Sequence, residues 1–568
     1  MIDWFAVHPS RYWTLAWSCF TVLTLAGIGP VLASLLTPAL EKSFSRFSPR
    51  WLFVALIFAV FLAFRWPLFF VGEELNPDES QLIAGGITLQ SDPIYWRSVD
   101  GTTHGPLDAY PLLAARLFGL PVGFGSARLI GSLMLIAAIL SIYLTLSGYY
   151  GEAMGRLGCL PAFCFFAFNT FWDFVHYSSE HAPVLLLGIG AMLLALDLAK
   201  PTERISFSWQ WFGGGIILGA VPLAKLQGAP IAAALLATGA IIDLCSGGVG
   251  LVCRFRRLGF LFLGTAAVPI ILVLVTVGAG QAEYAWKTYV VQNLYYTGDR
   301  HYSPAEMLRR FWDYADIGTG FYAFAAGMAA FAAITLLRAV TFPLSSLRLL
   351  TLSGVFLFVS LAAILAPGRQ YTHYLILLII PATLFAGCLM GSWWQQTKDQ
   401  PGTTVMRWFL LAAFIGILLW PQINSRTSQP HPYLSKLSAY AKTPVPPVVQ
   451  QILRYARPGE TLGQWGWMCR YYVLTGLRQA TRIAHTNQEI QYSPQIEFYR
   501  AHYLSDLKRN RPPVFIDTVG PGNFVFQDRA SGHESFPALR DYIAQNYNLV
   551  ADTDGTRVYA RKDRLTSP

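Results

Sequence analysis

Twelve long apolar runs constrain this sequence more than any other feature. A helix needs about 20 mostly apolar residues to cross a bilayer. Such runs lie near residues 13–37, 51–70, 128–148, 158–175, 182–199, 211–223, 229–245, 258–278, 321–337, 349–366, 373–392 and 408–421. The run at 211–223 is short, and Gly27, Gly29 and Pro30 interrupt the first run, which either spans or is re-entrant. The pattern therefore predicts a polytopic α-helical membrane protein with about 11–13 spans.

The composition agrees with this prediction. Hydrophobic residues make up 54% of the 568 residues and charged residues 13%, whereas a soluble globular protein has roughly 45–50% and 25%. So few charges could not solvate the surface of a soluble domain of this size. This excludes a soluble enzyme, a disordered chain and a nucleic-acid regulator. Seven cysteines are too few for a disulfide scaffold.

The character of the chain changes after Pro421. Residues 422–568 contain no spanning run and carry 18 basic and 11 acidic residues, about 20% charge, against about 11% before the boundary. A buried strand at 513–516 and a hairpin over 548–560 predict a small α/β domain. We therefore expect three parts: an extra span and a cytoplasmic loop over 1–50, a transmembrane domain over 51–421, and an extracytoplasmic α/β domain over 422–568.

Basic residues in the short loops determine the expected orientation. If the twelve runs alternate, one side holds Lys42, Arg46 and Arg50; Lys200 and Arg204; Arg254, Arg256 and Arg257; Arg338 and Arg348; and Lys398 and Arg407. That side is expected to be the cytoplasm. The opposite side then holds the segments 71–127 and 279–320 and the C-terminal domain. The N-terminus does not have the pattern of a cleavable signal peptide.

The first outside loop, 71–127, carries the strongest local feature, Asn76-Pro77-Asp78-Glu79-Ser80-Gln81. Solvated loop charges would explain Asp78 and Glu79 equally well. A carboxylate partly shielded from water, however, has a raised pKa and accepts a proton from an attacking hydroxyl or amine, so both residues are candidate catalytic groups. His104 in the same loop is suited to bind a phosphate or a sugar hydroxyl. It precedes an amphipathic stretch, 107–118, that is expected to lie in the membrane interface.

Further candidates lie at the outer ends of other spans. Glu180 falls in a tight outer turn, Ser178-Ser179-Glu180-His181. Lys225 lies close to membrane depth, where ionisable residues are costly and mark functional sites, although snorkelling is the plainer explanation. A last group of candidates lies near the end of a later span and consists of Arg369, Tyr371, His373 and Tyr374. The guanidinium of Arg369 has donors that match phosphate oxygens, and aromatic and imidazole groups lie beside it.

These candidates share the outer side of the membrane. We therefore expect one cavity that gathers carboxylates and cations at headgroup level, which suits a substrate with a lipid tail and a phosphate head. No paired cysteine, His-x-x-x-His or His-Glu-x-x-His pattern marks a metal site, so no metal or other cofactor is expected. A divalent cation has no sequence signature and stays open. No Walker or dinucleotide glycine motif indicates ATP or a soluble nucleotide donor.

The order of these motifs resembles that of the polytopic GT-C glycosyltransferases of the protein O-mannosyltransferase and aminoarabinose-transferase type. The resemblance covers roughly residues 51–421 and is carried by Asp78-Glu79, His104-Gly105-Pro106-Leu107, Ser179-Glu180, Lys225-Leu226-Gln227-Gly228, Tyr371-Thr372-His373-Tyr374 and Pro381. The segment from Gln464-Trp465-Gly466-Trp467 to Thr475-Gly476, then Arg482, is similar to the outside tail of bacterial relatives. Two features depart from the family. Relatives often show Lys or His followed by Pro-Pro where this chain has His104-Gly105-Pro106, and here an additional span comes first.

The resemblance implies an inverting transfer of a sugar from a polyprenyl-phosphate-linked donor to an envelope acceptor, which is lipid A, another glycan, a lipid or a protein. The reaction would occur on the outer side of a bacterial inner membrane. Asp78 would be the catalytic carboxylate, Glu79 would support it or hold the acceptor, and Glu180 would be a second acid of the cavity. Cations can stabilise a leaving phosphate in place of a general acid. The donor phosphate would be held by Lys225 and Arg369, with His104, Tyr371, His373 and Tyr374.

Two other functions stay open on the sequence. A transporter or flippase for a lipid or amphiphile explains the spans and the outer charges, but alternating access needs sites near the midplane and often repeated halves, which the sequence does not show. A non-catalytic subunit of an envelope-polysaccharide assembly is the other alternative. Most of the net charge of +10 lies in the C-terminal domain, beside anionic headgroups. The lipid bilayer is therefore an expected partner, and nucleic acid is not.

Overall fold

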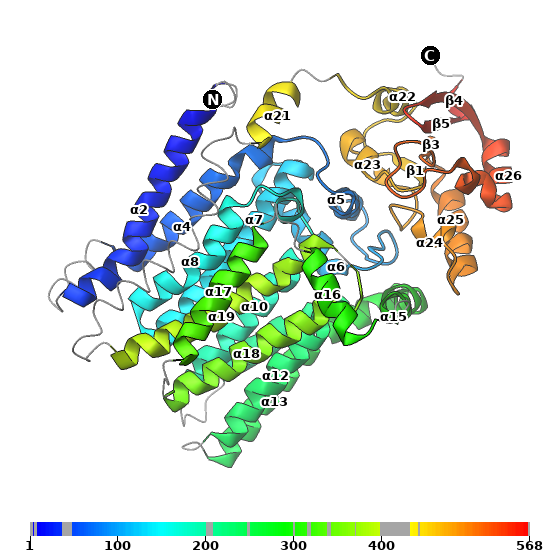
Figure 1. Ribbon diagram of the computed structural model, residues 1–568. Helices are drawn as coiled ribbons and strands as arrows, with labels where there is room; N and C mark the ends of the chain where they lie inside the picture. The colour runs from blue at the N-terminus through cyan, green and yellow to red at the C-terminus, as the bar shows by residue number, and fades with distance from the viewer. Residues whose placement is uncertain are drawn as a thin grey trace.

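The computed structural model shows a bundle of apolar helices with a small α/β domain at one end (Figure 1). It describes the whole chain except residues 1–3, 5–7, 37–47, 200–207, 247–249, 299–301, 315–319, 338–341, 370, 398–431, 441–443 and 566–568. The C-terminal domain lies beside two short helices of the first long loop, α5 (Pro77–Leu89) and α6 (Pro106–Ala109). The first long loop and the C-terminal domain therefore lie at the same end of the bundle.

Seven helices in the described residues are long and apolar enough to cross a membrane. They are Arg50–Phe70 (α4 and η1), Phe124–Tyr150 (α7), His181–Ala199 (α10), Leu226–Cys245 (η4 and α12), Leu251–Gly278 (α13), Leu344–Leu365 (α18) and Thr372–Thr397 (η7 and α19). Each coincides with one of the twelve predicted runs. The prediction of a polytopic α-helical membrane protein is therefore confirmed.

The other five runs differ from a simple span. The first forms one unbroken helix, α2 (Pro9–Leu36), with Pro30 inside it. The interruption expected there is absent, because a membrane helix can lose one backbone hydrogen bond at a proline without ending. The next three form shorter helices, α8 (Glu152–Phe168), α11 (Trp209–Ala220) and α17 (Phe321–Leu337). The run at 408–421 and the domain boundary at Pro421 lie outside the described residues.

Helices α11 and α13 approach closely because glycines line their contact. A Cβ atom on Gly215 of α11 would lie 2.3 Å from the carbonyl oxygen of Leu261, and one on Gly264 of α13 would lie 2.2 Å from that of Phe212. Small residues allow this approach, and close packing is what associates helices in lipid. The packing fixes the end of α11, from which the short turn η3 (Val221–Leu223) leads to Lys225.

The amphipathic stretch predicted over 107–118 has an unexpected backbone. The α-helical α6 gives way to a 3₁₀ segment, η2 (Tyr110–Phe118), which has a proline at its start. A proline lacks the N–H that an α-helix would use there. Leu117 and Phe118 at the end of η2 are exposed, so the segment still presents an apolar end at the outer face.

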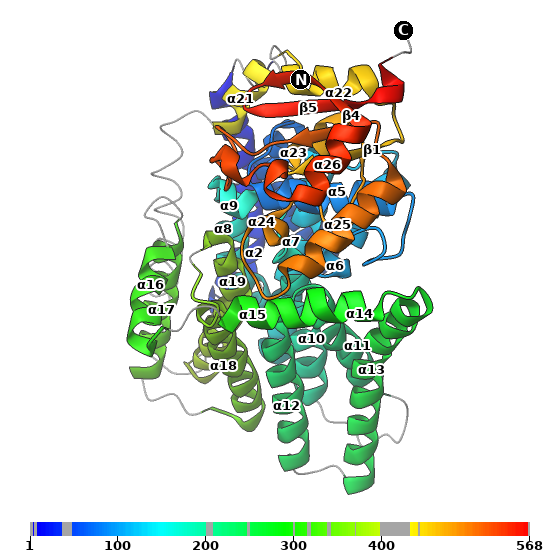
Figure 2. The same cartoon turned by 90° about the vertical axis from the view of Figure 1, so that its right-hand side faces the viewer.

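A second loop segment, which the sequence predicts to lie outside, crosses the ends of the membrane helices. α14 (Ala282–Ala285), η5 (Trp286–Val291) and α15 (Gln292–Gly298) follow one another directly and lie across the ends of α12 and α13, below the C-terminal domain (Figure 2). Asn293 donates from Nδ2 to the carbonyl oxygen of Thr102 at 2.9 Å. This bond joins the second loop segment to the first long loop.

The C-terminal domain contains one five-stranded sheet in the order β2-β1-β3-β5-β4. β1 pairs in parallel with both β2 and β3, whereas β5 is antiparallel to β3 and β4. The predicted buried strand and the predicted hairpin are both present. The elements of the domain are α22 (Pro447–Tyr455), β1 (Thr461–Trp465), α23 (Arg470–Thr475), β2 (Arg478–Gln479), α24 (Asn487–Ile490), α25 (Ile496–Asn510), β3 (Val514–Asp517), α26 (Pro537–Asn546), β4 (Tyr547–Thr553) and β5 (Thr556–Arg561).

Arg482 docks the C-terminal domain on the first loop. Its carbonyl oxygen accepts the backbone N–H of Asp100 at 2.6 Å, and its guanidinium donates to the carbonyl oxygen of Trp96 at 3.2 Å. The same guanidinium pairs with the buried carboxylate of Asp506 at 2.8 Å. The domain is therefore held directly over the loop that carries the candidate catalytic residues.

Candidate active site

Asp78 lies in the first turn of α5. Asn76 caps this helix, because its Oδ1 accepts the backbone N–H of Asp78 at 2.8 Å. A helix N-terminus stabilises a carboxylate through its partial positive charge. The Asp78 side chain is 40% exposed, whereas those of Glu79, Asp173 and Glu180 are at most 3% exposed. Of these four carboxylates, Asp78 is the one that a substrate can reach.

The surroundings of Asp78 suit a general base. Burial raises the pKa of Asp78, and the neighbouring His373, His176 and Lys225 oppose that shift only in part. A base is most effective when its pKa approaches the working pH. The local environment therefore moves Asp78 toward the range in which it can accept a proton.

Glu79 points into the protein and binds Arg128 of α7. The guanidinium donates from Nε to Oε1 at 2.9 Å and from Nη2 to Oε2 at 2.7 Å, and neither side chain is exposed. Arg128 also donates to the carbonyl oxygen of Val71 at 2.6 Å, and Glu79 accepts the backbone N–H of Tyr177 at 3.0 Å. The two adjacent carboxylates of the motif thus have separate environments.

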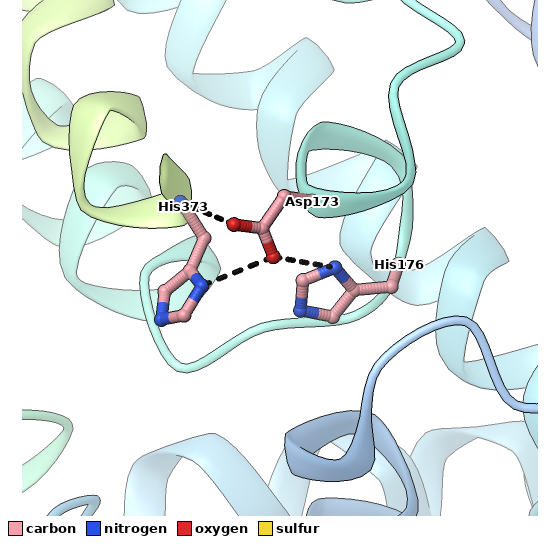
Figure 3. Close-up of side chains that lie close together, drawn as sticks. All are labelled: Asp173, His176 and His373. Atoms are coloured by element: carbon pink, nitrogen blue, oxygen red, sulfur yellow. Dashed lines mark hydrogen bonds and ion pairs between the residues drawn. The ribbon is translucent and has the colours of Figure 1, made fainter. Parts of the chain in front are cut away.

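Asp173 lies between two histidines, His176 and His373 (Figure 3). Its Oδ1 is 3.2 Å from Nδ1 of His373 and 3.8 Å from Nδ1 of His176, and its Oδ2 accepts the backbone N–H of His373 at 3.0 Å. The other ring nitrogen of His373, Nε2, lies 4.0 Å from Oδ2 of Asp78. Burial raises the pKa of Asp173, but the two histidines outweigh it and lower that pKa to about 2. Asp173 is therefore an ionised anchor that orients His373 toward Asp78.

Asn76 links this anchor to the base. Its Nδ2 donates to Oδ1 of Asp173 at 2.9 Å, while its Oδ1 caps the helix at Asp78. One side chain thus fixes both the start of α5 and the carboxylate that holds His373. Asp78, Asn76, Asp173 and His373 form a closed ring of contacts across three segments of the chain.

Lys225 and Glu180 form a buried ion pair on another side of the site. Nζ of Lys225 contacts Oε1 of Glu180, donates to Oγ of Ser179 at 2.9 Å, and lies 4.5 Å from the ring centroid of Tyr374. Burial raises the pKa of Glu180, but Lys225 outweighs it and lowers that pKa to about 2. Glu180 is therefore ionised, and three predicted site residues meet here.

His104 is brought to the same place by a backbone bridge to Lys225. The ring is 6% exposed, and neither ring nitrogen has a hydrogen-bond partner among the described residues. Burial and the nearby charge of Lys225 lower the pKa of His104 to about 3. His104 is therefore neutral, and it can bind an uncharged ligand group better than it can supply charge to a phosphate.

Arg369 and Tyr371 complete the predicted set. The guanidinium of Arg369 lies 4.3 Å from the ring centroid of Tyr296 in α15. Tyr371 is 43% exposed and stacks on His373 at a centroid distance of 5.6 Å. Tyr371 thus contacts the site through His373, and part of its side chain remains exposed.

The sequence did not reveal four residues that shape this site: Asn76, Arg128, Asp173 and His176. Asn76 and Pro77 belong to the motif Asn76-Pro77-Asp78-Glu79-Ser80-Gln81. An Asn-Pro pair before acidic residues is a helix-start signal, and it could have identified Asn76 as the cap of α5. Asp173 and His176 lie in the short turn α9 (Trp172–Val175) and at its end. No local pattern marks them, because their partner His373 is distant in the sequence.

Asp173, His176 and His373 are also the residues best suited to bind a metal ion. Their ligand atoms lie within 4.8 Å of one another. Asp173 already accepts hydrogen bonds from Asn76 and His373, and Nδ1 of His176 is 3.0 Å from the carbonyl oxygen of Trp172. A metal ion would therefore have to replace several of these bonds. A second group in the described residues, Asp517, His533 and Glu534, is already paired with Arg557.

The helical bundle, the first loop beginning with α5 and the C-terminal α/β domain together form a fold that is also found in solved structures. The structure of ArnT from Cupriavidus metallidurans bound to undecaprenyl phosphate matches with a TM-score of 0.57 and 14% identity, over 91% of this chain and 99% of the ArnT chain. ArnT in the apo state matches with a TM-score of 0.54, with the same identity and coverage. These matches show a shared fold.

Archaeal oligosaccharyltransferase AglB from Archaeoglobus fulgidus, in complex with an inhibitory peptide and a dolichol-phosphate, is less similar. Its TM-score is 0.41 at 12% identity, over 91% of this chain and 74% of the AglB chain. No protein-family model and no curated protein matches this chain. The roles of the site residues therefore have to be argued from their chemistry.

Proposed function

We propose that this protein is an inverting glycosyltransferase that moves a sugar from a polyprenyl-phosphate-linked donor to an envelope acceptor. The observation that carries the proposal is Asp78, an accessible carboxylate at a helix N-terminus that faces His373 beside the buried cation Lys225. The fold shared with ArnT, which was solved with undecaprenyl phosphate bound, supports a lipid-phosphate donor.

Asp78 acts in this proposal as the general base. It accepts the proton of an acceptor hydroxyl or amine while the acceptor atom attacks the anomeric carbon. The bond between that carbon and the phosphate oxygen breaks, and the electron pair leaves with the phosphate. Attack opposite the leaving group inverts the anomeric configuration. The raised pKa of Asp78 favours the proton transfer.

Cations around the base stabilise the leaving phosphate. Lys225 and Arg369 supply positive charge, because an ammonium and a guanidinium both bind phosphate oxygens. His373, whose Nδ1 is held by Asp173 and whose Nε2 faces Asp78, is a further hydrogen-bond donor for the same phosphate. The hydroxyls of Tyr371 and Tyr374 are further donors. Glu180 keeps Lys225 in place in the absence of the donor.

Glu79 is assigned a structural role in this proposal. Its two carboxylate oxygens already bind Arg128, and neither side chain is exposed. It therefore supports Asp78 by fixing the start of α5 and does not contact the acceptor. His104, which is neutral, is assigned to the uncharged part of the donor or acceptor.

We further propose that the reaction takes place at the outer face of a bacterial inner membrane. The first loop and the C-terminal domain lie at one end of the bundle, where the predicted topology has few basic loop residues. A basic C-terminal domain at this face would attract anionic headgroups. From that face the protein would reach its acceptor, which is lipid A, another envelope glycan, a lipid or a protein.

The test is mass spectrometry of envelope glycolipids and glycans from cells with and without the protein. Loss of a hexose, pentose or uronic acid from one component identifies both the sugar and the acceptor. Asp78→Asn should reproduce the deletion phenotype, and Asp92→Asn, an exposed loop carboxylate paired with Arg97, should not. Full transfer by a normally inserted Asp78→Asn protein would falsify the proposed mechanism.

No cofactor is part of this proposal. Transfer by the purified protein should therefore persist after treatment with EDTA. If EDTA abolished transfer and a divalent cation restored it, the role of Asp173, His176 and His373 would instead be to bind that metal ion.

A further inference from the structure

We propose that the C-terminal domain contains a carbohydrate-binding subsite, formed by Trp467, His485 and Phe524, that opens toward Asp78. The inference rests on the proposed glycosyl transfer, since a pyranose ring is the group that such a reaction brings to this face. A pyranose presents hydroxyls at its rim and apolar C–H groups on its faces. The subsite matches both properties.

The topology of the sheet places a crevice at this position. β1 lies between β2 and β3 in a parallel arrangement, so the chain leaves β1 toward one neighbour and returns on the other side of it. In open α/β sheets, ligands bind outside the carboxyl ends of the strands at such a switch point. Gly466, the first residue after β1, has φ +100°, and a Cβ atom there would lie 2.3 Å from Oγ1 of Thr518 after β3. The loops after β1 and β3 thus meet at the crevice.

Aromatic rings line the crevice. The rings of Trp467 and His485 stack with a centroid distance of 4.1 Å and an interplanar angle of 17°. Phe524 meets Trp467 edge to face at 5.8 Å and is 58% exposed. Aromatic faces carry negative charge and attract positively polarised C–H groups. An apolar sugar face therefore has a platform on which to bind.

Two hydrogen-bond donors beside these rings have no partner among the described residues. His485 is 1% exposed, and its Nδ1 accepts the backbone N–H of Asn487 at 3.2 Å. Burial lowers the pKa of His485 to about 3, so the ring is neutral and carries its proton on Nε2. The Nε2 atom of His485 and the Nε1 atom of Trp467 are both buried, and neither has a hydrogen-bond partner among the described residues. Buried donors are nearly always paired, so a ligand oxygen would satisfy these two.

The crevice adjoins the candidate active site. Of the three subsite residues, Phe524 lines a neighbouring cavity of about 590 Å³ together with Glu74, Pro77 and Trp172, and small-molecule sites have roughly 300–1,000 Å³. Pro77 precedes Asp78 and Trp172 precedes Asp173 in the chain. A sugar bound here lies between the C-terminal domain and the catalytic loop.

The first experiment measures binding without turnover. Full-length protein in nanodiscs is titrated with undecaprenyl phosphate and with undecaprenyl phosphate carrying a hexose or a pentose. His485→Phe retains the stacked ring and removes the donor, and Trp467→Phe does the same for the indole N–H. If the subsite binds the donor sugar, the preference for the sugar-bearing lipid falls about fivefold to tenfold in both variants, and affinity for the bare lipid phosphate is unchanged.

The second experiment tests the acceptor as the source of the sugar. Transfer is followed with glycolipid extracted from cells that lack the protein. If the subsite binds the acceptor, the KM for that extract rises about fivefold to tenfold and donor affinity is unchanged. Tyr492→Phe, on a ring that is 84% exposed in the same domain, is the matched control and should behave as the wild type in both experiments.

The outcomes separate this inference from the proposed function. If both variants keep the wild-type Tm, donor selectivity and acceptor KM, the subsite is rejected even though transfer continues. If the variants lose sugar selectivity and the wild-type protein itself transfers no sugar, the subsite is supported and the proposed glycosyl transfer is rejected. Unfolding of one variant is detected by its Tm, and the other variant then decides.

Discussion

The buried pair of Glu79 and Arg128 allows the sharpest test of how the site is built. Arg128 joins the bundle to the loop through three carbonyl oxygens, those of Leu68, Val71 and Glu73, at 2.6–3.1 Å. It also holds the Glu79 carboxylate through two nitrogens. If this pair is structural, its loss should lower stability and activity together.

The size of the expected loss in the free energy of unfolding follows from the burial of Glu79 and Arg128. Removing one partner of a buried ion pair leaves an uncompensated charge and costs about 3–5 kcal/mol. Arg128→Met should therefore lower the free energy of unfolding by about that amount, and the loss of the carbonyl contacts adds to it. Glu79→Gln keeps its volume and loses charge-assisted hydrogen bonds, each worth about 1.5–3 kcal/mol. The double variant should lose less than the sum of the two, because no unpaired charge remains.

The assay combines thermal unfolding in nanodiscs with transfer measured well below the Tm of every variant. Both single variants should show a Tm several degrees below that of the wild type. Asp92→Asn, which breaks an exposed pair, should change little, since surface pairs contribute about 0–1 kcal/mol. If Glu79→Gln had the wild-type Tm and no transfer activity, Glu79 would be catalytic and the structural reasoning would be wrong.

Three further predictions concern the active site and the docked domain. Because burial raises the pKa of Asp78 and a base must be ionised, the transfer rate should fall as the pH drops through that raised pKa; a pH–rate profile whose acidic limb lay at or below the ordinary pKa of an aspartate would contradict this. Asp173→Asn should lower kcat by a larger factor than it raises the donor KM, because it leaves His373 in place but misoriented; equal effects on both constants would argue against positioning. Arg482→Gln should loosen the C-terminal domain, so limited proteolysis should cut the 482–506 region faster than in the wild type, and an unchanged cleavage rate would show that Arg482 and Asp506 are dispensable for docking.

The sequence predicted the candidate site residues better than it predicted the residues that contact them. Asp78, Lys225 and His373 were found because charged and polar side chains next to apolar runs are conspicuous, and the structure brings them together. Asp173 and Arg128 were not found, because each lies far along the chain from the residue it contacts. Pairing of that kind depends on which helices pack against each other, and hydropathy contains no information about it.

The sequence by itself determined the membrane-spanning helices and indicated the small α/β domain. The helices could be predicted because the transfer of apolar side chains into lipid depends on about 20 neighbouring residues. Only the tertiary structure decided the separation of Asp78 from Glu79. Adjacent residues on a helix point about 100° apart, and the packing of α5 against α7 determines that one carboxylate binds Arg128 and the other remains open to substrate.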